Sequence, residues 1–261
     1  MYKSKIAIIG AGAMGGAIAD GILSRGVIPA ANLVISNHTP GRLERFAQSG
    51  AVLTTDNREA VAKADWVILA VKPWLVENVI DDVRDLLTAD KVLISVAAGV
   101  DSFNLCRWTG EVCHLFIAIP NIAIAQGQSM TFVKPVDCTD ELKDEVVHFF
   151  DEMGKTCVCT EAQLQAGMAL ASCGIAYAFR YIRAASEGGV ELGFKARQAQ
   201  DIVMQTLKGA VGLLEAEGLH PEEAVDRVTT PGGITIRGLN AMEEAGFTSA
   251  VVKGLKASVA K

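Results

Sequence analysis

Two glycine-rich stretches of the sequence contain residues suited to binding anions. The first is GAGAMG at residues 10–15, which follows an aliphatic run, and the second is PGG at residues 231–233. A helix-period pattern follows each stretch. The first N–H groups of a helix have no internal partner and lie at the positive end of the helix dipole. Glycines beside those N–H groups let a phosphate or a carboxylate approach closely, so both stretches are candidate anion sites.

The first stretch has the spacing of a dinucleotide-binding turn. In this interpretation Gly10 forms the tight turn, Gly12 lets the backbone meet a pyrophosphate, and Gly15 lets the helix pack on the strand. The motif lies between an expected strand at residues 5–9 and an expected helix from Ala17. We therefore predict a cofactor site formed by residues 10–15, with Ala13 and Met14 included.

The elements that would position this site alternate along the first part of the chain. Strands are expected at residues 32–36, 66–71, 92–96 and 114–119, and helices at residues 42–49, 58–62 and 75–87. This alternation predicts an α/β fold, a doubly wound Rossmann domain with a mainly parallel sheet. We place this domain at residues 1–159 and an all-α dimerisation and substrate domain at residues 160–261.

The carboxyl ends of the strands should form the ligand-binding edge of this sheet. Four segments follow strands there: residues 36–39, 71–73, 97–99 and 120–121. We predict that this edge binds the cofactor through Ser36, Asn37, Thr39, Val71, Lys72, Pro73, Ala97, Pro120 and Asn121. Lys72 is expected to contribute its backbone rather than its amine, and its alternative role is that of a surface lysine.

The end of the second strand indicates which dinucleotide is preferred. NAD sites usually carry an acidic residue there to hold the ribose 2′-hydroxyl. Here the sequence is SNHT at residues 36–39, followed by Arg42 and Arg45. Hydroxyls, an amide and arginines can bind a 2′-phosphate that a carboxylate would repel, so NADPH is favoured and NADH is expected to be weaker. His38 is either a phosphate contact or a solvated loop residue.

The chain from Thr160 onward shows helical patterns and no strand pattern. Helices are expected at residues 163–187, 195–217, 233–245, from Pro221 and after Thr248. The long helices are apolar over more than one stripe, which predicts a homodimer or a higher homo-oligomer of dimers. No Ser–His–Asp grouping or carboxylate pair stands out. Hydride transfer to an already electrophilic carbon fits, because the cofactor performs the difficult step.

Composition argues against several classes of protein. The formal charge of −6 and the lack of a basic stripe argue against nucleic-acid binding. The apolar stretch at residues 115–125 is interrupted by Pro120 and is too short to span a bilayer. Six cysteines without a C-x-x-C pair, and no secretory segment, predict reduced thiols in the cytoplasm and no metal site.

The sequence resembles pyrroline-5-carboxylate reductases over essentially its whole length. The resemblance includes residues 10–15, Asn57 in DNREAV, VILAVKP (67–73), SVAAGV (95–100), IPN (119–121), GGVELG (188–193), QTLKGA (205–210) and, as the most specific part, VTTPGGITIRGL (228–239). It implies a Rossmann domain and a helical domain that forms an intertwined dimer. It also implies NADPH-dependent reduction of 1-pyrroline-5-carboxylate, a cyclic imine, to L-proline. Asn57 and Ala70 join the expected cofactor residues.

The resemblance implies that the second glycine-rich stretch binds the substrate carboxylate. The expected substrate residues are Gly232, Gly233, Ile234 and Thr235, with the N–H groups of the last three holding the carboxylate. Thr235 is the catalytic candidate, because its hydroxyl is the one side-chain donor in the loop. It would orient the substrate, while water or an already protonated iminium supplies the proton. The alternative role of Thr235 is helix capping.

Two segments depart from the usual sequence of the family. MPNTPA is replaced by IPNIA at residues 119–123, and SGSGPAY by ASCGIAY at residues 171–177, which loses a helix-kinking proline. A related cyclic imine carboxylate therefore remains an alternative substrate, and a non-catalytic NADPH-binding paralogue an alternative function. A β-hydroxyacid dehydrogenase would usually need a lysine on the first long helix, but no lysine lies between Lys155 and Lys195.

Overall fold

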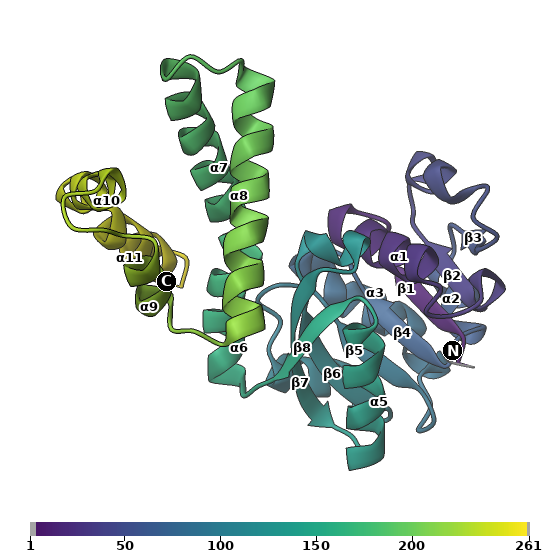
Figure 1. The fold of residues 1–261 in the computed structure, drawn as a ribbon. Helices are drawn as coiled ribbons and strands as arrows, with labels where there is room; N and C mark the ends of the chain where they lie inside the picture. The colour runs from purple at the N-terminus through teal and green to yellow at the C-terminus, as the bar shows by residue number, and fades with distance from the viewer. Residues whose placement is uncertain (1–3, 260–261) are drawn as a thin grey trace. The chain divides into compact units, whose positions relative to one another are not determined.

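The chain contains two compact units that divide between Ser172 and Cys173. A computed structural model describes residues 4–259 (Figure 1). The first unit is an eight-stranded sheet with helices, and the described part of the second is helical. This confirms the predicted fold class, a doubly wound α/β domain followed by an all-α region.

The sheet of the first unit is parallel except for one antiparallel pair. Its order is β3-β2-β1-β4-β5-β6-β7-β8, and β6 and β7 are the antiparallel pair. The order reverses at β1 and β4, which makes the crevice between them the expected ligand position in an open α/β sheet. The strands are β1 (Ile6–Ile9), β2 (Leu33–Ser36), β3 (Val52–Thr54), β4 (Trp66–Leu69), β5 (Val92–Ser95), β6 (His114–Ile119), β7 (Ser129–Asp137) and β8 (Gly154–Val158).

Helices cover both faces of this sheet, and each face has its own buried cluster. Ile8 of β1 packs in one cluster with Ile18 and Phe149, whereas Ile9 packs in the other with Val79 and Leu105. Successive side chains of a strand point to opposite faces, so the fully aliphatic β1 supplies both clusters. The helices are α1 (Ala13–Arg25), α2 (Asn57–Ala62), α3 (Val76–Val83), α4 (Ser102–Thr109), α5 (Asp140–Asp151) and α6 (Glu161–Gly167).

Short 3-10 segments complete the first unit. They are η1 (Ala30–Asn32), η2 (Pro40–Arg42), η3 (Glu44–Phe46), η4 (Pro73–Leu75), η5 (Arg84–Leu86) and η6 (Ile122–Gln126). The helix expected at residues 42–49 is therefore formed as two 3-10 turns. Pro40 begins η2 and Leu43 separates it from η3, and no regular α-helical turn spans the two.

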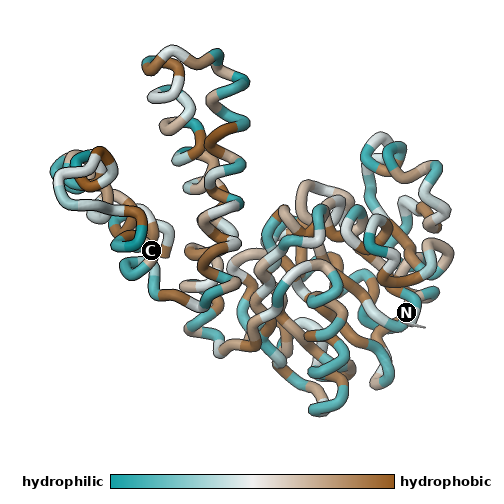
Figure 2. Tube along the Cα trace, in the orientation of Figure 1, coloured by the Kyte–Doolittle hydropathy of each residue, from teal (hydrophilic) through white to brown (hydrophobic). Residues whose placement is uncertain are grey.

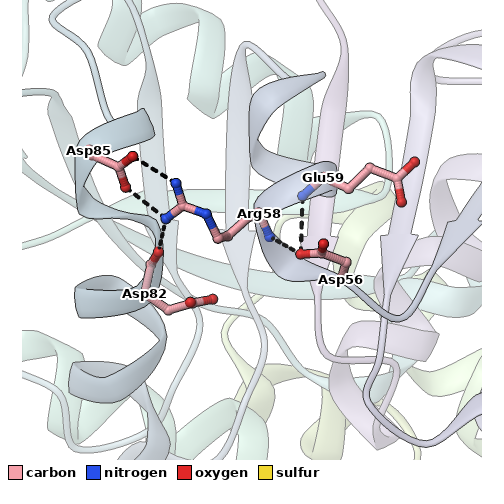
Figure 3. Close-up of polar contacts among 5 residues, drawn as sticks. All are labelled: Asp56, Arg58, Glu59, Asp82 and Asp85. Carbon is pink, nitrogen blue, oxygen red and sulfur yellow. Dashed lines mark hydrogen bonds and ion pairs between the residues drawn. The ribbon is translucent and has the colours of Figure 1, made fainter.

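An exposed ion pair joins α2 to η5, the 3-10 segment that follows α3 (Figure 3). Asp56 caps α2 by accepting the N–H groups of Arg58 and Glu59, and the Arg58 guanidinium donates to both oxygens of Asp85 at 2.7 Å each. The hydrogen bonds from Arg58 lower the pKa of the Asp85 carboxyl. Exposed pairs of this kind add little to stability, which makes this one a useful control below.

The helix expected at residues 163–187 is interrupted. After α6 the chain continues as a π-helix, η7 (Met168–Cys173), before α7 (Gly174–Glu191). The interruption follows close packing on the sheet: a Cβ on Gly167 would lie 2.7 Å from the ring of Phe132 in β7. Because α6 packs on β7, the compact units divide after Ser172. The functional domain boundary at residues 159 and 160 stays a prediction.

The second unit has almost no core of its own. Ala199 is the only buried residue between 173 and 259, whereas Phe179, Leu213 and Ile234 are 58%, 57% and 80% exposed. Figure 2 shows hydrophobic segments recurring along its helices. The helices are α7, α8 (Ala196–Glu217), α9 (Pro221–Arg227), α10 (Ile234–Glu244) and α11 (Phe247–Ala257).

Exposed polar contacts connect helices within this second unit. The Tyr177 hydroxyl of α7 donates to the carbonyl of Gly254 in α11 at 3.3 Å and also contacts the Ser258 hydroxyl. An ion pair between Arg227 and Glu217 connects α9 to α8. These contacts are exposed, so they orient the helices without supplying an apolar core.

Candidate functional site

The turn between β1 and α1 requires glycine at two positions. Gly10 has a φ of +103°, and a Cβ there would lie 2.8 Å from the carbonyl oxygen of Ala70. A Cβ on Gly15 would lie 1.9 Å from the carbonyl oxygen of Gly10. Any larger residue at Gly15 must push the turn away from the helix. The glycines therefore bring α1 directly against the turn and against the end of β4.

The beginning of α1 fits an anionic group. Its N-cap residue is Gly12, no side chain caps the helix, and the first turn contains no acidic residue. The N–H groups of Ala13 and Met14 donate no hydrogen bond within residues 4–259. Unpaired N–H groups at the positive end of a helix dipole are suited to the pyrophosphate of a dinucleotide.

Side chains at the end of β2 hold the neighbouring loops in place. Asn37 Oδ1 accepts the N–H of Ala11 at 3.0 Å, and its Nδ2 donates to the carbonyl of Thr39 at 3.0 Å. The buried Ser36 donates its hydroxyl to Asn57 Oδ1 at 2.7 Å. These side chains therefore connect the glycine-rich turn, the end of β2 and the start of α2. This positioning role was not foreseen from the sequence, and their cofactor contacts stay predictions.

The two arginines after β2 differ in their partners. Arg45 pairs with Asp20 of α1, and its guanidinium lies 4.8 Å from the centroid of the Phe46 ring. The Arg42 side chain has no hydrogen bond or ion pair within the described residues, and its Nη1 lies 3.5 Å from the position of a Cβ on Gly12. Arg42 therefore has its charge available at the beginning of α1, while Arg45 is already paired.

Strands β1, β2, β4, β5 and β6 run parallel, so their carboxyl ends lie at one edge of the sheet. The predicted residues Ala70, Val71, Lys72 and Pro73 follow β4 at this edge. The exposed Lys72 lies 6.0 Å from the centroid of the Trp74 ring. Ala97 follows β5 and is buried, and the turn after it has a φ of +80° at Gly99.

The segment after β6 is held by residues that follow α6. Asn121 is buried; its Oδ1 accepts the N–H of Ala123 at 3.0 Å, and its Nδ2 lies 3.5 Å from the carbonyl oxygen of Ala171. The Ser172 hydroxyl donates to the carbonyl of Pro120 at 3.2 Å. The predicted residues Pro120 and Asn121 are therefore held both by their own loop and by the segment that follows α6.

The second glycine-rich stretch forms a tight turn in the second unit. The N–H of Gly233 donates to the carbonyl of Thr230 at 2.9 Å, and Gly232 has a φ of +71°. Proline at the second position and glycine with positive φ at the third are typical of a type II turn. A Cβ on Gly233 would lie 2.5 Å from Thr230 Oγ1. The PGG sequence therefore suits this turn, with the positive φ of Gly232 favouring glycine there.

This turn reduces the number of free donors before α10. The N–H of Gly233 donates to the carbonyl of Thr230 and closes the turn, and its expected contact with a carboxylate stays a prediction. The N–H groups of Ile234 and Thr235 donate no hydrogen bond within the described chain, and no side chain caps α10. The Thr235 hydroxyl caps nothing and is exposed. Two N–H groups and one hydroxyl therefore remain available together.

The potential metal ligands of the described residues do not gather into one site, and the cysteines are not paired. Between residues 4 and 259, no three His, Cys, Asp or Glu side chains gather in a way that could hold a metal ion. All six cysteines are free thiols, and burial raises the pKa of Cys113 to about 12. None of the helices within residues 4–259 has the length and apolar character needed to cross a membrane.

Both parts of the chain are similar to known protein families. Residues 161–261 match the family model for pyrroline-5-carboxylate reductase dimerisation, and residues 5–99 match that for coenzyme F420-dependent NADP oxidoreductases. Pyrroline-5-carboxylate reductase 2 of Dictyostelium discoideum is 35% identical, with 99% of this chain and 92% of that protein covered. The chain belongs to the pyrroline-5-carboxylate reductase family.

Other members of the pyrroline-5-carboxylate reductase family are similar over the whole chain. Reductase 1 of Dictyostelium discoideum is 35% identical over 99% of this chain, which spans 49% of that longer protein. The crystal structure of Plasmodium falciparum pyrroline carboxylate reductase with NADP bound has a TM-score of 0.91 and 25% identity, with 99% of this chain and 97% of that chain covered.

The segments that depart from the usual sequence of pyrroline-5-carboxylate reductases contact each other in this chain. Pro120 and Asn121 of the first segment are bonded to Ser172 and Ala171 of the second. Ile122, which replaces the usual threonine, is 48% exposed at the start of η6. The two departures therefore change one neighbourhood at the edge of the sheet.

Proposed function

We propose that this protein reduces 1-pyrroline-5-carboxylate to L-proline with NADPH, the last step of proline biosynthesis. Family membership supports this reaction, and the observation that carries it is the PGG turn before α10. The turn leaves the N–H groups of Ile234 and Thr235 and the Thr235 hydroxyl free at a helix beginning. This arrangement suits the carboxylate of a small imine.

The cofactor is proposed to bind along the carboxyl edge of the sheet. NADPH would supply the hydride that reduces the imine carbon. The glycine-rich turn and the N–H groups of Ala13 and Met14 would hold its pyrophosphate, and Arg42 would face its 2′-phosphate. The other proposed contacts are Ser36, Asn37, Thr39, Asn57, Ala70, Val71, Lys72, Pro73, Ala97, Pro120 and Asn121. Arg42 lacks a competing partner, which supports a preference for NADPH over NADH.

The substrate residues act by placement. The N–H groups of Ile234 and Thr235 hold the carboxylate, and Gly232 and Gly233 shape the turn that presents them. The Thr235 hydroxyl donates to the carboxylate or to the imine nitrogen and fixes the orientation of the ring, since correct placement supplies much of the rate. The nitrogen receives its proton from water or enters as an iminium, because a hydroxyl is too weakly acidic to be the final proton source.

Assembly is proposed to be a homodimer through residues 160–261, or an oligomer of such dimers. A groove of about 1000 Å³ between α7 and α8 is lined by Phe179, Ile182, Val190 and Met204, with charged residues at its margin. Apolar surface of this extent on a unit without a core usually marks an interface. The reduced thiols support the expected cytoplasmic location, which stays a proposal.

The reaction is tested by following NADPH oxidation with three imines. 1-Pyrroline-5-carboxylate should give the highest kcat/KM, above the six-membered imine carboxylate and 1-pyrroline-2-carboxylate. A higher kcat/KM with either of these two would identify a related imine as the substrate. NADPH binding without turnover of any imine would identify a non-catalytic paralogue.

A further inference from the structure

The Glu161 carboxylate joins three segments that are far apart in the sequence. Its Oε1 accepts the backbone N–H of Ser102 at 2.9 Å, and its Oε2 accepts the Ser102 hydroxyl. The same carboxylate pairs with Lys134 Nζ of β7 at 3.3 Å. The first residue of α6 is thereby bonded to the first residue of α4 and to the sheet.

The chemistry of this cluster favours an ionised carboxylate. The Ser102 N–H has no partner within its own helix because it lies at the beginning of α4, and the helix dipole favours negative charge there. The Lys134 side chain is only 18% exposed. Burial acts to raise the pKa of Glu161, but the hydrogen bonds from Ser102 and the charge of Lys134 outweigh it and lower that pKa. Charge-assisted hydrogen bonds are stronger than neutral ones.

Ser102, the first residue of α4, directly follows the loop of residues 97–101 that leads out of β5. Residues 97–101 turn through a hydrogen bond from the N–H of Val100 to the carbonyl of Ala97 at 3.4 Å. Ala97 and Val100 are buried, and no other side chain outside α4 is hydrogen-bonded to this loop in the described residues. Packing of Ala97 and Val100 holds the middle of the loop, and the contact between Ser102 and Glu161 fixes its end at the start of α4.

The other end of the same segment holds the loop after β6. The Ser172 hydroxyl donates to the Pro120 carbonyl, and the Ala171 carbonyl accepts from Asn121. Between the two ends, Gly167 packs directly on the Phe132 ring of β7. Residues 161–172, here called the strap, thus lie on the sheet with each end bonded to a different strand-end loop.

We propose that the strap positions loops 97–101 and 120–122 for the nicotinamide half of the cofactor, and that Glu161 is its main positioning residue. This inference rests on the proposed function. The adenosine half belongs with β2, where Ser36, Asn37 and Arg42 lie, so the other half crosses the switch point toward β4, β5 and β6. The hydrogen bonds from the strap to strand-end loops reach loops on this second side.

Removing the charge of Glu161 tests the strap. The Glu161→Gln variant keeps the shape of the side chain but weakens the hydrogen bonds from Ser102 and leaves Lys134 without its ion pair. Asp85→Asn is the matched control, because it removes a two-bonded carboxylate from Arg58 in the same unit with no contact to either loop. Ser102→Ala and Ser172→Ala each remove one hydroxyl and should have smaller effects than Glu161→Gln.

Calorimetry with two ligands separates the halves of the cofactor. In Glu161→Gln, the Kd of NADPH should rise about three- to tenfold, since part of a charged hydrogen bond is lost. The Kd of 2′,5′-ADP, which lacks the nicotinamide, should stay within about twofold of wild type because residues 10–15 and 36–39 are unchanged. Asp85→Asn should change neither Kd.

Hydrogen exchange gives a readout that does not depend on the cofactor. In the free protein, Glu161→Gln should speed exchange at residues 97–105 relative to wild type and to Asp85→Asn, because opening of a local segment follows the contacts that hold it. Wild-type exchange at these residues, or an equal loss of affinity for both ligands, would overturn the proposed positioning role of the strap. A wild-type protein that failed to bind NADPH would instead overturn the proposed function, while the exchange result still decides the strap.

Discussion

The two units of this protein bury their apolar residues in different ways. The first encloses its sheet between two clusters of fully buried side chains such as Ile8, Leu69 and Phe149. The second, between residues 173 and 259, buries only Ala199 while Phe179, Leu192 and Phe194 are half or more exposed. Because burial of apolar surface dominates folding, the first unit has a core of its own, whereas the second leaves apolar surface of the kind that usually marks an interface.

The glycine-rich turns of the two units also differ in how much they depend on contacts with the rest of the unit. A side chain at Gly10 or Gly15 would clash with Ala70 or with the turn itself, so the first turn is shaped by its contact with the sheet. A Cβ on Gly232 would meet nothing within 4 Å, and Gly233 is close only to Thr230 of its own turn. The first candidate anion site is therefore shaped by tertiary packing, whereas the second is shaped by local turn chemistry.

The largest expected effect is at Gly15. Gly15→Val should raise the Kd of NADPH by more than about a hundredfold, because the new side chain must displace the pyrophosphate turn. Calorimetry measures the loss, and circular dichroism shows whether the sheet still forms. Gly16→Ala is the matched control: its Cβ would lie 3.1 Å from the end of the long Arg45 side chain and 3.9 Å from the nearest backbone atom, the carbonyl oxygen of Ala11. Equal losses in both variants would contradict the close packing assigned to Gly15.

A charge introduced on the apolar surface of the second unit should weaken the dimer while the first unit still binds its ligand. Phe179→Asp should raise the dimer dissociation constant by about a hundredfold, because an unpaired charge would be buried at an apolar interface. Light scattering measures the mass, and binding of 2′,5′-ADP should persist because the first unit keeps its core. Asp144→Lys on the exposed face of α5 is the control, and it should leave the mass unchanged. An active monomer would refute the proposed dimer.

Thr235 tests the second anion site directly. Thr235→Ala should lower kcat/KM for the imine by about ten- to a hundredfold, the value of a hydrogen bond to a charged group. The Kd of NADPH should be unchanged in the same variant, and Thr235→Ser should retain most activity. Steady-state kinetics and calorimetry give the two quantities. Wild-type kcat/KM in Thr235→Ala, or loss of activity only through unfolding, would show that the hydroxyl has no role.

The smallest expected effect distinguishes the arginines of the first site. Arg42→Ala should lower the ratio of kcat/KM with NADPH to that with NADH by about tenfold, because one charge-assisted contact to the 2′-phosphate is removed. Arg45→Ala should change this ratio less, since Arg45 is paired with Asp20. The reverse order of the two variants would assign the phosphate contact to Arg45.

Most of the sheet could be predicted from aliphatic runs, and the failures have physical reasons. Strands β1, β2, β4, β5 and β6 are buried runs that the sequence displays directly. Strand β3 has only three residues, β7 contains Lys134 and Pro135, and the GKTCV of β8 is partly polar, so none of the three gives a strong pattern. Their formation depends on pairing with strands already in place.

The sequence by itself determined where glycine is needed, the order of the five buried strands β1, β2, β4, β5 and β6, and the family of the chain. The tertiary structure decided which polar groups remain available. Asn37 and Arg45 have side chains suited to phosphate, yet both are bonded to residues of the glycine-rich turn or α1. The N–H of Gly233 is used within its own turn, and Glu161 gains its role from Ser102 and Lys134. A residue type fixes what a group can donate or accept, but its partners are brought near only by folding.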